Sequence, residues 1–188
     1  MRLSEYGLKN GINEVIGITK GRWLNTAPLG IIVDDEDSQR AKVRLYKSHT
    51  RDNVEKGCDL WVNVVFDPIV FVISAFDDLG EGFFDSLEPP VLKSAISWAR
   101  FTTRIAGSFA ELKLVEGGVT GSNTRAINRG LNSIIEALVH ATRFKISPTE
   151  ELRNKILYYG EIVNKCGGED EKKAYKLILK YTGLSSIL

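Results

Sequence analysis

The chain begins with patterns typical of β-strands and ends with patterns typical of α-helices. In the first two thirds, short runs of β-branched residues, or of alternating apolar and polar residues, lie between turn sequences such as Lys20-Gly21-Arg22. These patterns predict strands at residues 12–19, 24–33, 41–46, 60–65, 95–105 and 109–115. The first two strands and the last two are expected to form hairpins, because a short turn joins each pair.

Helices are predicted where apolar residues recur every three or four positions. The clearest case is 128–144, where one stripe contains Leu131, Ile134, Ile135, Leu138, Val139 and Thr142. The capping-box pattern Ser147-Pro148-Thr149-Glu150 is expected to open a second helix, with proline at its first position, that runs to about residue 165. A third helix is expected at 170–181, before Gly183.

Two shorter helices are predicted among the strands. Residues 50–55 precede Gly57, and glycine suits the left-handed conformation that ends many helices. Asp67 and Pro68 would open a helix through residue 75, because aspartate caps free amides and proline fits the first turn. A strand over 69–76 is the alternative.

The order of these elements indicates the fold class and the domains. Strands first and helices last are typical of an α+β protein rather than of alternating βαβ units. We expect a barrel domain at residues 1–122 and a helical subdomain at 123–188.

Composition narrows the classes of function. The 188 residues carry a net charge of +1 with both signs interspersed, which argues against nucleic-acid and membrane partners. Cys58 and Cys166 fit no metal-binding or disulfide spacing, so no metal site is expected. The N-terminal residues lack an apolar signal core, and the apolar run 62–76 is broken by polar residues and too short to span a bilayer. A cytoplasmic protein is expected.

The segment Asn25-Thr26-Ala27-Pro28-Leu29-Gly30 is unusual inside a predicted strand. Proline cannot donate a hydrogen bond to a neighbouring strand, and glycine contributes no side-chain packing. One explanation is an edge strand with a bulge. The other is a backbone left open to meet a flat polar ligand at close range. The segment alone favours the first explanation.

A second candidate is the corner Lys47-Ser48-His49-Thr50, with Asn53 one turn further along the predicted helix. A cation, hydroxyl groups and the unpaired amides of a helix start together suit a phosphate group. The alternative is an ordinary helix cap with Ser48 or Thr50 as the capping residue and His49 exposed. The corner also lacks the glycine spacing of a P-loop.

A polar stripe lies opposite the apolar stripe of the 128–144 helix. It consists of Arg129, Asn132, Glu136, His140 and Arg143. Glu136 and His140 are one turn apart and could form an acid/base pair or an ion-pair network with the arginines, although such a stripe is more often solvated. Because its charges can neutralise one another, we expect it to be partly buried against the barrel or a second subunit. The local sequence completes neither a nucleophile triad nor a metal-ligand set, so a hydrolase has little support.

Several motifs, taken in order, resemble one family. They are residues 12–16, residues 25–30, residues 48–50 with Asn53, residues 62–64 with Asp67-Pro68, and Asn128-Arg129 with residues 135–143. The ordered set resembles the flavin split-barrel proteins and, within them, a mostly archaeal group known as domain of unknown function 447. The resemblance spans about residues 12–144, and the helices beyond Ser147 carry little of it.

The resemblance implies an antiparallel six-stranded split β-barrel, usually a homodimer, with FMN in a groove near the subunit interface. It implies that residues 25–30 line the isoalloxazine ring and that Ser48, Thr50 and Asn53 hold the phosphate or the ribityl chain. The full set of expected FMN-binding residues is Asn25, Thr26, Ala27, Pro28, Leu29, Gly30, Lys47, Ser48, His49, Thr50, Asn53 and Asn63. His49 departs from the basic or small residue that is more usual in the family.

The chemistry implied by the resemblance would come mainly from the cofactor. FMN carries its own reactive atom, so the protein would orient the ring and bind the phosphate. The first hypothesis is an FMN-dependent oxidoreductase that accepts hydride from a nicotinamide or a deazaflavin. The alternatives are a flavin-binding or storage protein that has no turnover or acts through a partner, and a purely structural dimer. No catalytic or substrate-contacting residue is assigned by motif.

Overall fold

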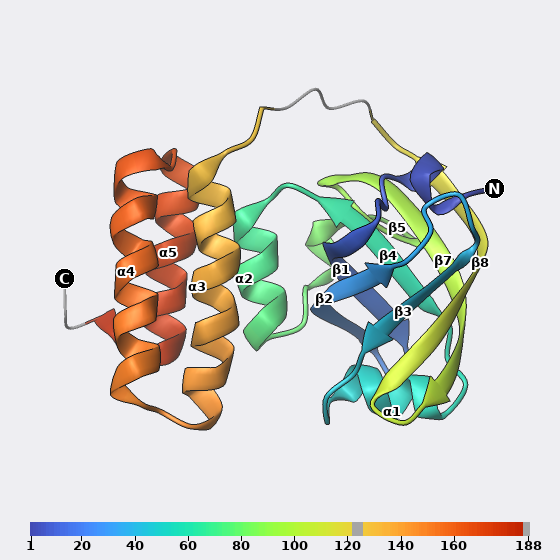
Figure 1. Cartoon of the computed structure of the whole chain (residues 1–188), viewed down its shortest axis with the longest axis horizontal. Coiled ribbons are helices and arrows are strands. Elements are labelled where there is room, and N and C mark those ends of the chain that lie inside the picture. The colour runs from blue at the N-terminus through green and yellow to red at the C-terminus, as the bar shows by residue number, and fades with distance from the viewer. Residues whose placement is uncertain (122–125, 186–188) are drawn as a thin grey trace. The chain divides into compact units, whose positions relative to one another are not determined.

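The computed structural model describes residues 1–121 and 126–185, which divide into two compact units (Figure 1). The barrel unit contains Met1–Val65 and residues 78–121, and the helical unit contains Phe66–Asp77 and residues 126–185. This division differs in one respect from the boundary expected between residues 122 and 123. Residues 66–77 were expected in the barrel domain, and they pack with the C-terminal helices instead.

Six antiparallel strands form a closed barrel, which confirms the predicted α+β class. The strands are β1 (Gly11–Lys20), β2 (Leu24–Val33), β3 (Arg40–Arg44), β4 (Leu60–Val65), β7 (Ala95–Ala106) and β8 (Phe109–Val119). Their order around the barrel is β1-β2-β3-β8-β7-β4, and pairing of β1 with β4 closes the ring. Both predicted hairpins, β1–β2 and β7–β8, are confirmed.

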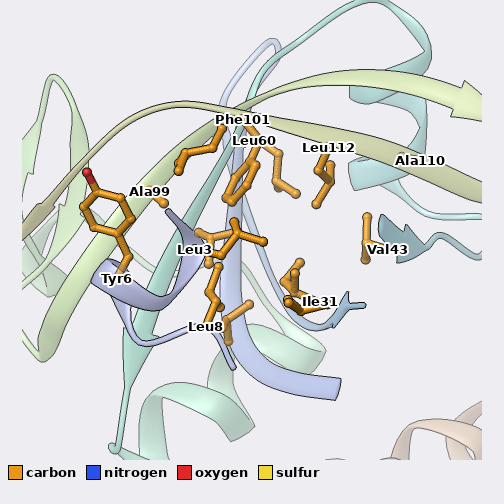
Figure 2. Close-up of a cluster of buried hydrophobic side chains, with 14 of the residues drawn as sticks. Leu3, Tyr6, Leu8, Ile31, Val43, Leu60, Ala99, Phe101, Ala110 and Leu112 are labelled. Carbon is orange, nitrogen blue, oxygen red and sulfur yellow. The ribbon is translucent and has the colours of Figure 1, made fainter. Parts of the chain in front are cut away.

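Alternation along the strands fills the barrel with apolar side chains. On β4, Leu60 and Val62 belong to the core, and Trp61 between them faces outward. Figure 2 shows Leu3 and Leu8 of the N-terminal segment, which includes the 3₁₀ helix η1 (Leu3–Tyr6), among side chains from the strands, such as Phe101. Each fully buried leucine contributes roughly 1.5–3 kcal/mol, so the N-terminal segment is an integral part of the core.

Helix α1 (His49–Glu55) joins β3 to β4 and confirms the short helix predicted there. Ser48 is its cap, because the Ser48 hydroxyl accepts a hydrogen bond from the backbone N–H of Arg51 at 3.3 Å. Gly57 has a φ angle of +84°, the left-handed conformation expected of it.

A small hairpin covers part of the outside of β4. It consists of β5 (Phe84–Leu87) and β6 (Pro90–Leu92), preceded by the 3₁₀ helix η2 (Glu81–Phe83). The hairpin was not predicted, because prolines are poor members of a strand. A buried side chain on β4 fixes it: Asn63 Oδ1 accepts a hydrogen bond from the Leu92 N–H at 2.8 Å, and Asn63 Nδ2 donates to the Pro90 carbonyl at 3.2 Å.

The helical unit consists of α2 (Pro68–Phe76), α3 (Arg129–Ile146), α4 (Glu150–Cys166) and α5 (Glu169–Thr182), and Figure 1 shows α3, α4 and α5 side by side. The apolar stripe of α3 is buried, as predicted. Small residues allow close packing: a Cβ atom at Gly160 would lie 2.0 Å from Tyr175 Cζ. None of the helices described over residues 1–121 and 126–185 combines the length and the hydropathy of a membrane span.

Two helix starts were predicted from capping patterns, one correctly. At α2, Asp67 Oδ1 accepts hydrogen bonds from the backbone N–H groups of Ile69 and Val70, so the alternative strand over 69–76 is wrong. At α4, the predicted capping box at Ser147 is wrong. The Ser147 N–H still donates to the Arg143 carbonyl in the last turn of α3, so the next hydroxyl residue, Thr149, caps α4. Proline therefore precedes the helix.

Candidate functional site

Strand β2 has one open edge over most of its length. It pairs with β1 at every position from Leu24 to Val33, without a break in register. Its other edge pairs with β3 only at Ile31 and Ile32. Residues 24–30 therefore carry an edge with which no strand in the described part of the chain pairs. The unusual segment 25–30 lies on this edge, and the expected bulge is absent from its pairing with β1.

The backbone of residues 26, 28 and 30 points away from β1. The Thr26 N–H shows this direction, because it donates to Asp78 Oδ1 at 2.8 Å. In an antiparallel strand the N–H and the carbonyl of one residue face the same side, and the side alternates from residue to residue. Pro28 has no N–H and so presents only a carbonyl to this side, whereas Gly30 presents both groups. The open edge thus offers three carbonyls and one N–H besides that of Thr26.

The side chains of the same segment face in two directions. The side chains of Ala27 and Leu29 lie on the same face of β2, and Leu29 packs against the barrel core. Thr26 is buried, and its hydroxyl accepts a hydrogen bond from the Leu79 N–H at 2.9 Å.

A buried polar cluster holds α1 against the end of the barrel. Asn25 Nδ2 donates to Thr50 Oγ1 at 2.9 Å, and the two residues are only 5% and 2% exposed. Asn53 Nδ2 donates to Thr19 Oγ1 at 2.9 Å, and Thr19 is fully buried. The structure thus brings together three of the expected FMN-binding residues. The Asn25–Thr50 and Asn53–Thr19 hydrogen bonds fix the start of α1 against strands β1 and β2.

The exposed part of this corner consists of Lys47, Ser48 and His49. The Ser48 hydroxyl donates to the Tyr46 carbonyl at 3.1 Å, besides accepting from Arg51, so its proton is already engaged. The His49 ring meets the Trp23 ring edge to face, with 5.3 Å between centroids. Lys47 provides the cation that an anionic group would need.

Asn63 is the predicted site residue that lies apart from the open edge and the corner. It is fully buried, and both polar ends of its side chain bind β6. Its observed hydrogen bonds are structural, and a contact with the cofactor stays a prediction.

Two residues at the open edge were not among those expected from the sequence. Asp78 accepts from the Thr26 N–H through Oδ1 and from Trp23 Nε1 through Oδ2, each at 2.8 Å. Trp23 is 49% exposed. An aromatic residue in a turn is the one signal that could have pointed to Trp23, whereas Asp78 is brought to Thr26 from 52 positions along the chain.

The polar stripe on α3 is largely exposed in the single chain. Arg129, Asn132, Glu136 and Arg143 are exposed, and His140 is half-buried. Within the helical unit only His140 of this stripe is partly covered, and burial of the stripe against the barrel or a second subunit stays a prediction.

The environment of His140 differs from that of the other residues in the polar stripe. The His140 ring stacks on Tyr159, with centroids 5.8 Å apart, and its Nδ1 atom is buried and has no hydrogen-bond partner among the described residues. Burial, together with the nearby cations Lys155 and Arg143, lowers the pKa of His140. The imidazole is therefore mainly neutral at pH 7.

Among the hollows on the surface of the described residues are two that lie away from the predicted site. One, of about 580 Å³, is lined by Asp34, Arg40, Ala41, Lys42, Thr102, Thr103, Arg104, Glu111, Leu112 and Lys113. The other, of about 570 Å³, is lined by His140, Glu151, Asn154, Lys155, Tyr158 and Tyr159. Both are lined largely by charged and polar residues, and neither includes a predicted FMN-binding residue. Within the described residues, no group of three or more His, Cys, Asp and Glu side chains is placed to hold a metal ion.

A solved structure is similar to this chain over almost its whole length. An FMN-bound protein from Methanosarcina mazei, described as a member of the DUF447 family, is 40% identical, with a TM-score of 0.85. The match covers 95% of this chain and 99% of that chain.

Two flavin reductases are also similar, at a much lower level. The flavin reductase of styrene monooxygenase from Pseudomonas putida S12 is 10% identical, with a TM-score of 0.46, over 60% of this chain and 82% of that chain. The flavin reductase component of a bacterial two-component tryptophan halogenase is 13% identical, also with a TM-score of 0.46, over 65% and 86%. Neither similarity is close enough to indicate a function for this chain.

Family models match most of the chain. The model of the DUF447 N-terminal domain, from a protein family of unknown function, matches residues 13–125, and the model of the DUF447 C-terminal part matches residues 128–180. The resemblance noted in the sequence is thereby confirmed and extends further than expected, into the last helices. The chain belongs to the DUF447 family.

Proposed function

We propose that this protein binds FMN in its barrel unit, with the isoalloxazine ring along the open edge of β2. The observation that carries this proposal is the likeness to the FMN-bound Methanosarcina mazei protein, at 40% identity over 95% of this chain. The barrel provides an independent reason, since 24–30 is an edge with which no strand among the described residues pairs.

The groups at this edge fit a flavin. The polar edge of an isoalloxazine ring carries both hydrogen-bond acceptors and a donor, which the Gly30 N–H and the outward carbonyls of residues 26, 28 and 30 could satisfy. The place of a Gly30 side chain is filled by Ile12 and Glu14 of β1, because a Cβ atom there would lie 2.9 Å from Ile12 Cγ2 and 3.3 Å from Glu14 Oε1. A flat ligand would therefore meet this segment through the outward backbone groups of residues 26, 28 and 30.

The phosphate is proposed to lie at the corner where α1 begins. Lys47 is exposed there, and its charge would attract the dianionic phosphate. Ser48 would have to exchange its bond to the Tyr46 carbonyl for one to the phosphate. Asn25, Thr50 and Asn53 would act mainly by fixing this corner relative to β2, through the buried hydrogen bonds already described.

The reaction proposed is a flavin-dependent oxidation or reduction, with a nicotinamide or a deazaflavin as the electron donor. Bound FMN would supply the hydride or electron transfer itself. The residues of this chain would orient the ring through the β2 backbone and limit its exposure to water. A second subunit would complete the cover of a ring that lies along the unpaired stretch of β2, so we propose a homodimer.

The absorption spectrum of the freshly purified protein tests this proposal. A bound flavin band, released on denaturation as FMN in about equal amount to the protein, is the expected result. Steady-state oxidation of NADH, NADPH or a reduced deazaflavin then tests turnover. Flavin binding without turnover would favour the non-catalytic alternative, and a protein that neither carries nor takes up FMN would contradict the proposal.

A further inference from the structure

Trp23 comes immediately before β2, and its indole ring is fixed beside the open edge. Trp23 Nε1 donates to Asp78 Oδ2 at 2.8 Å, and the Thr26 N–H donates to Asp78 Oδ1 at 2.8 Å. One carboxylate therefore ties the indole to the backbone of β2 at the start of the open stretch. Hydrogen bonds to a carboxylate are stronger than those between neutral groups, so the tie is firm.

Two further contacts restrain this arrangement. The Leu79 N–H donates to Thr26 Oγ1 at 2.9 Å, which fixes the chain next to Asp78. The His49 ring lies against the Trp23 ring at an interplanar angle of 89°. The indole is thus held on two sides, by Asp78 and His49, although Trp23 is 49% exposed.

A restrained and exposed indole is unusual for a side chain that meets only water. Fixing a side chain costs conformational entropy, and a large aromatic surface left in water gives none of the stabilisation that burial would give. Both costs are offset when a flat ligand covers the exposed face, because stacking needs a ring that is already oriented. The open β2 edge beside it is where the flavin ring is proposed to lie.

We propose that Trp23 is a ligand-contacting residue whose exposed indole face stacks on the flavin ring, and that Asp78 is the positioning residue that holds the indole. This inference rests on the proposed function and deepens it. It adds two residues, Trp23 and Asp78, to the set expected from the family resemblance.

The test measures FMN binding to the full chain by flavin fluorescence. Contact with an indole quenches flavin emission, so the wild-type protein should bind FMN in a weakly emitting form. Trp23→Leu should raise the Kd about 10-fold or more, the scale of losing one aromatic stacking contact, and should leave the bound flavin brightly emitting. Trp23→Phe keeps a smaller aromatic face, so its Kd should lie between the two, with emission also increased.

Trp98→Phe is the matched control. Trp98 is on β7, which two strands, β1 and β4, separate from β2 in the barrel. This variant should match the wild type in both Kd and emission. Circular dichroism and thermal melting check that each variant is folded, and if Trp23→Leu does not fold, the emission of Trp23→Phe decides.

Asp78→Asn tests the positioning role. It keeps one acceptor oxygen and replaces the other by an amide, so one of the two hydrogen bonds is lost. The Kd should rise less than in Trp23→Leu, and adding Asp78→Asn to Trp23→Leu should change the Kd little further, because Asp78 acts through the indole.

The outcomes separate the two proposals. If the wild type binds FMN but Trp23→Leu has the same Kd and the same emission, the inference is overturned and the proposed function stands. The same holds if Trp23→Leu alters only the oligomeric state, which would assign the indole to contact with a second copy. If the wild type does not bind FMN, the proposed function itself fails.

Discussion

Replacing Thr50 by valine should destabilise the barrel unit. Thr50 is 2% exposed, and its hydroxyl accepts the hydrogen bond from Asn25 Nδ2 at 2.9 Å. Valine has nearly the shape of threonine, so packing is kept while the acceptor is removed. The buried amide of Asn25 then has no partner for this hydrogen, and leaving a buried polar group unsatisfied costs about 1–3 kcal/mol.

A double variant isolates the hydrogen bond from the other effects of substitution. In Asn25→Leu with Thr50→Val, both polar partners are gone and no buried donor is left unpaired. The double variant should therefore lose less stability than the sum of the two single variants, by about 1 kcal/mol or more for residues in direct contact.

Urea unfolding followed by tryptophan fluorescence measures these changes. Trp23, Trp61 and Trp98 all lie in the barrel unit, so the signal reports on that unit and not on the helices. A loss below about 0.5 kcal/mol for Thr50→Val, the range of ordinary surface substitutions, would contradict this prediction, as would strict additivity of the two single variants. Either result would mean that Asn25 and Thr50 do not support the corner through a buried bond.

Three other predictions follow from the same structure. Replacing Lys47 and Ser48 together by alanine should weaken FMN binding by about 1–3 kcal/mol, the scale of hydrogen bonds to a charged group; an unchanged Kd in calorimetry would remove the phosphate from this corner. Gly160→Ala should lower the melting temperature, because its Cβ would lie 2.0 Å from the Tyr175 ring; a melting temperature equal to that of the wild type would contradict this packing. The pKa of His140 is lowered in the folded chain from its ordinary value of 6.5, so the unfolded chain binds the proton first as the pH falls below that value, and stability declines. Urea unfolding at pH 7 and pH 5 should show a smaller decline for His140→Gln than for the wild type, and equal declines would show that His140 is not responsible.

Much of the fold could be predicted because local patterns agree with it. The alternation at 41–46 was sufficient to predict β3, and the capping pattern at Asp67 was sufficient to predict the start of α2. Strand faces and helix starts are set within a few residues of sequence. The β5–β6 hairpin was missed because Asn63, far from it in sequence, holds it in place. The start of α4 was misplaced because two hydroxyl residues compete there, and the end of α3 decides between them.

The candidate site was predictable in its backbone and less so in its side chains. Pro28 marks the open edge because it has no N–H to donate on the side away from β1, although it pairs with β1 on the other side. The buried bond between Asn25 and Thr50 depends on strand register and on the approach of α1, which no local pattern contains. Asp78 follows the inserted helix α2 and meets β2 only in the folded chain.

The most direct test of the central claim is a calorimetric titration of FMN into the purified protein after any bound flavin has been removed. We expect saturable binding of about one FMN per chain, with a Kd in the micromolar range or below, equivalent to about −8 kcal/mol or stronger. Heats that show no saturation up to about 1 mM FMN, equivalent to binding weaker than about −4 kcal/mol, would contradict it.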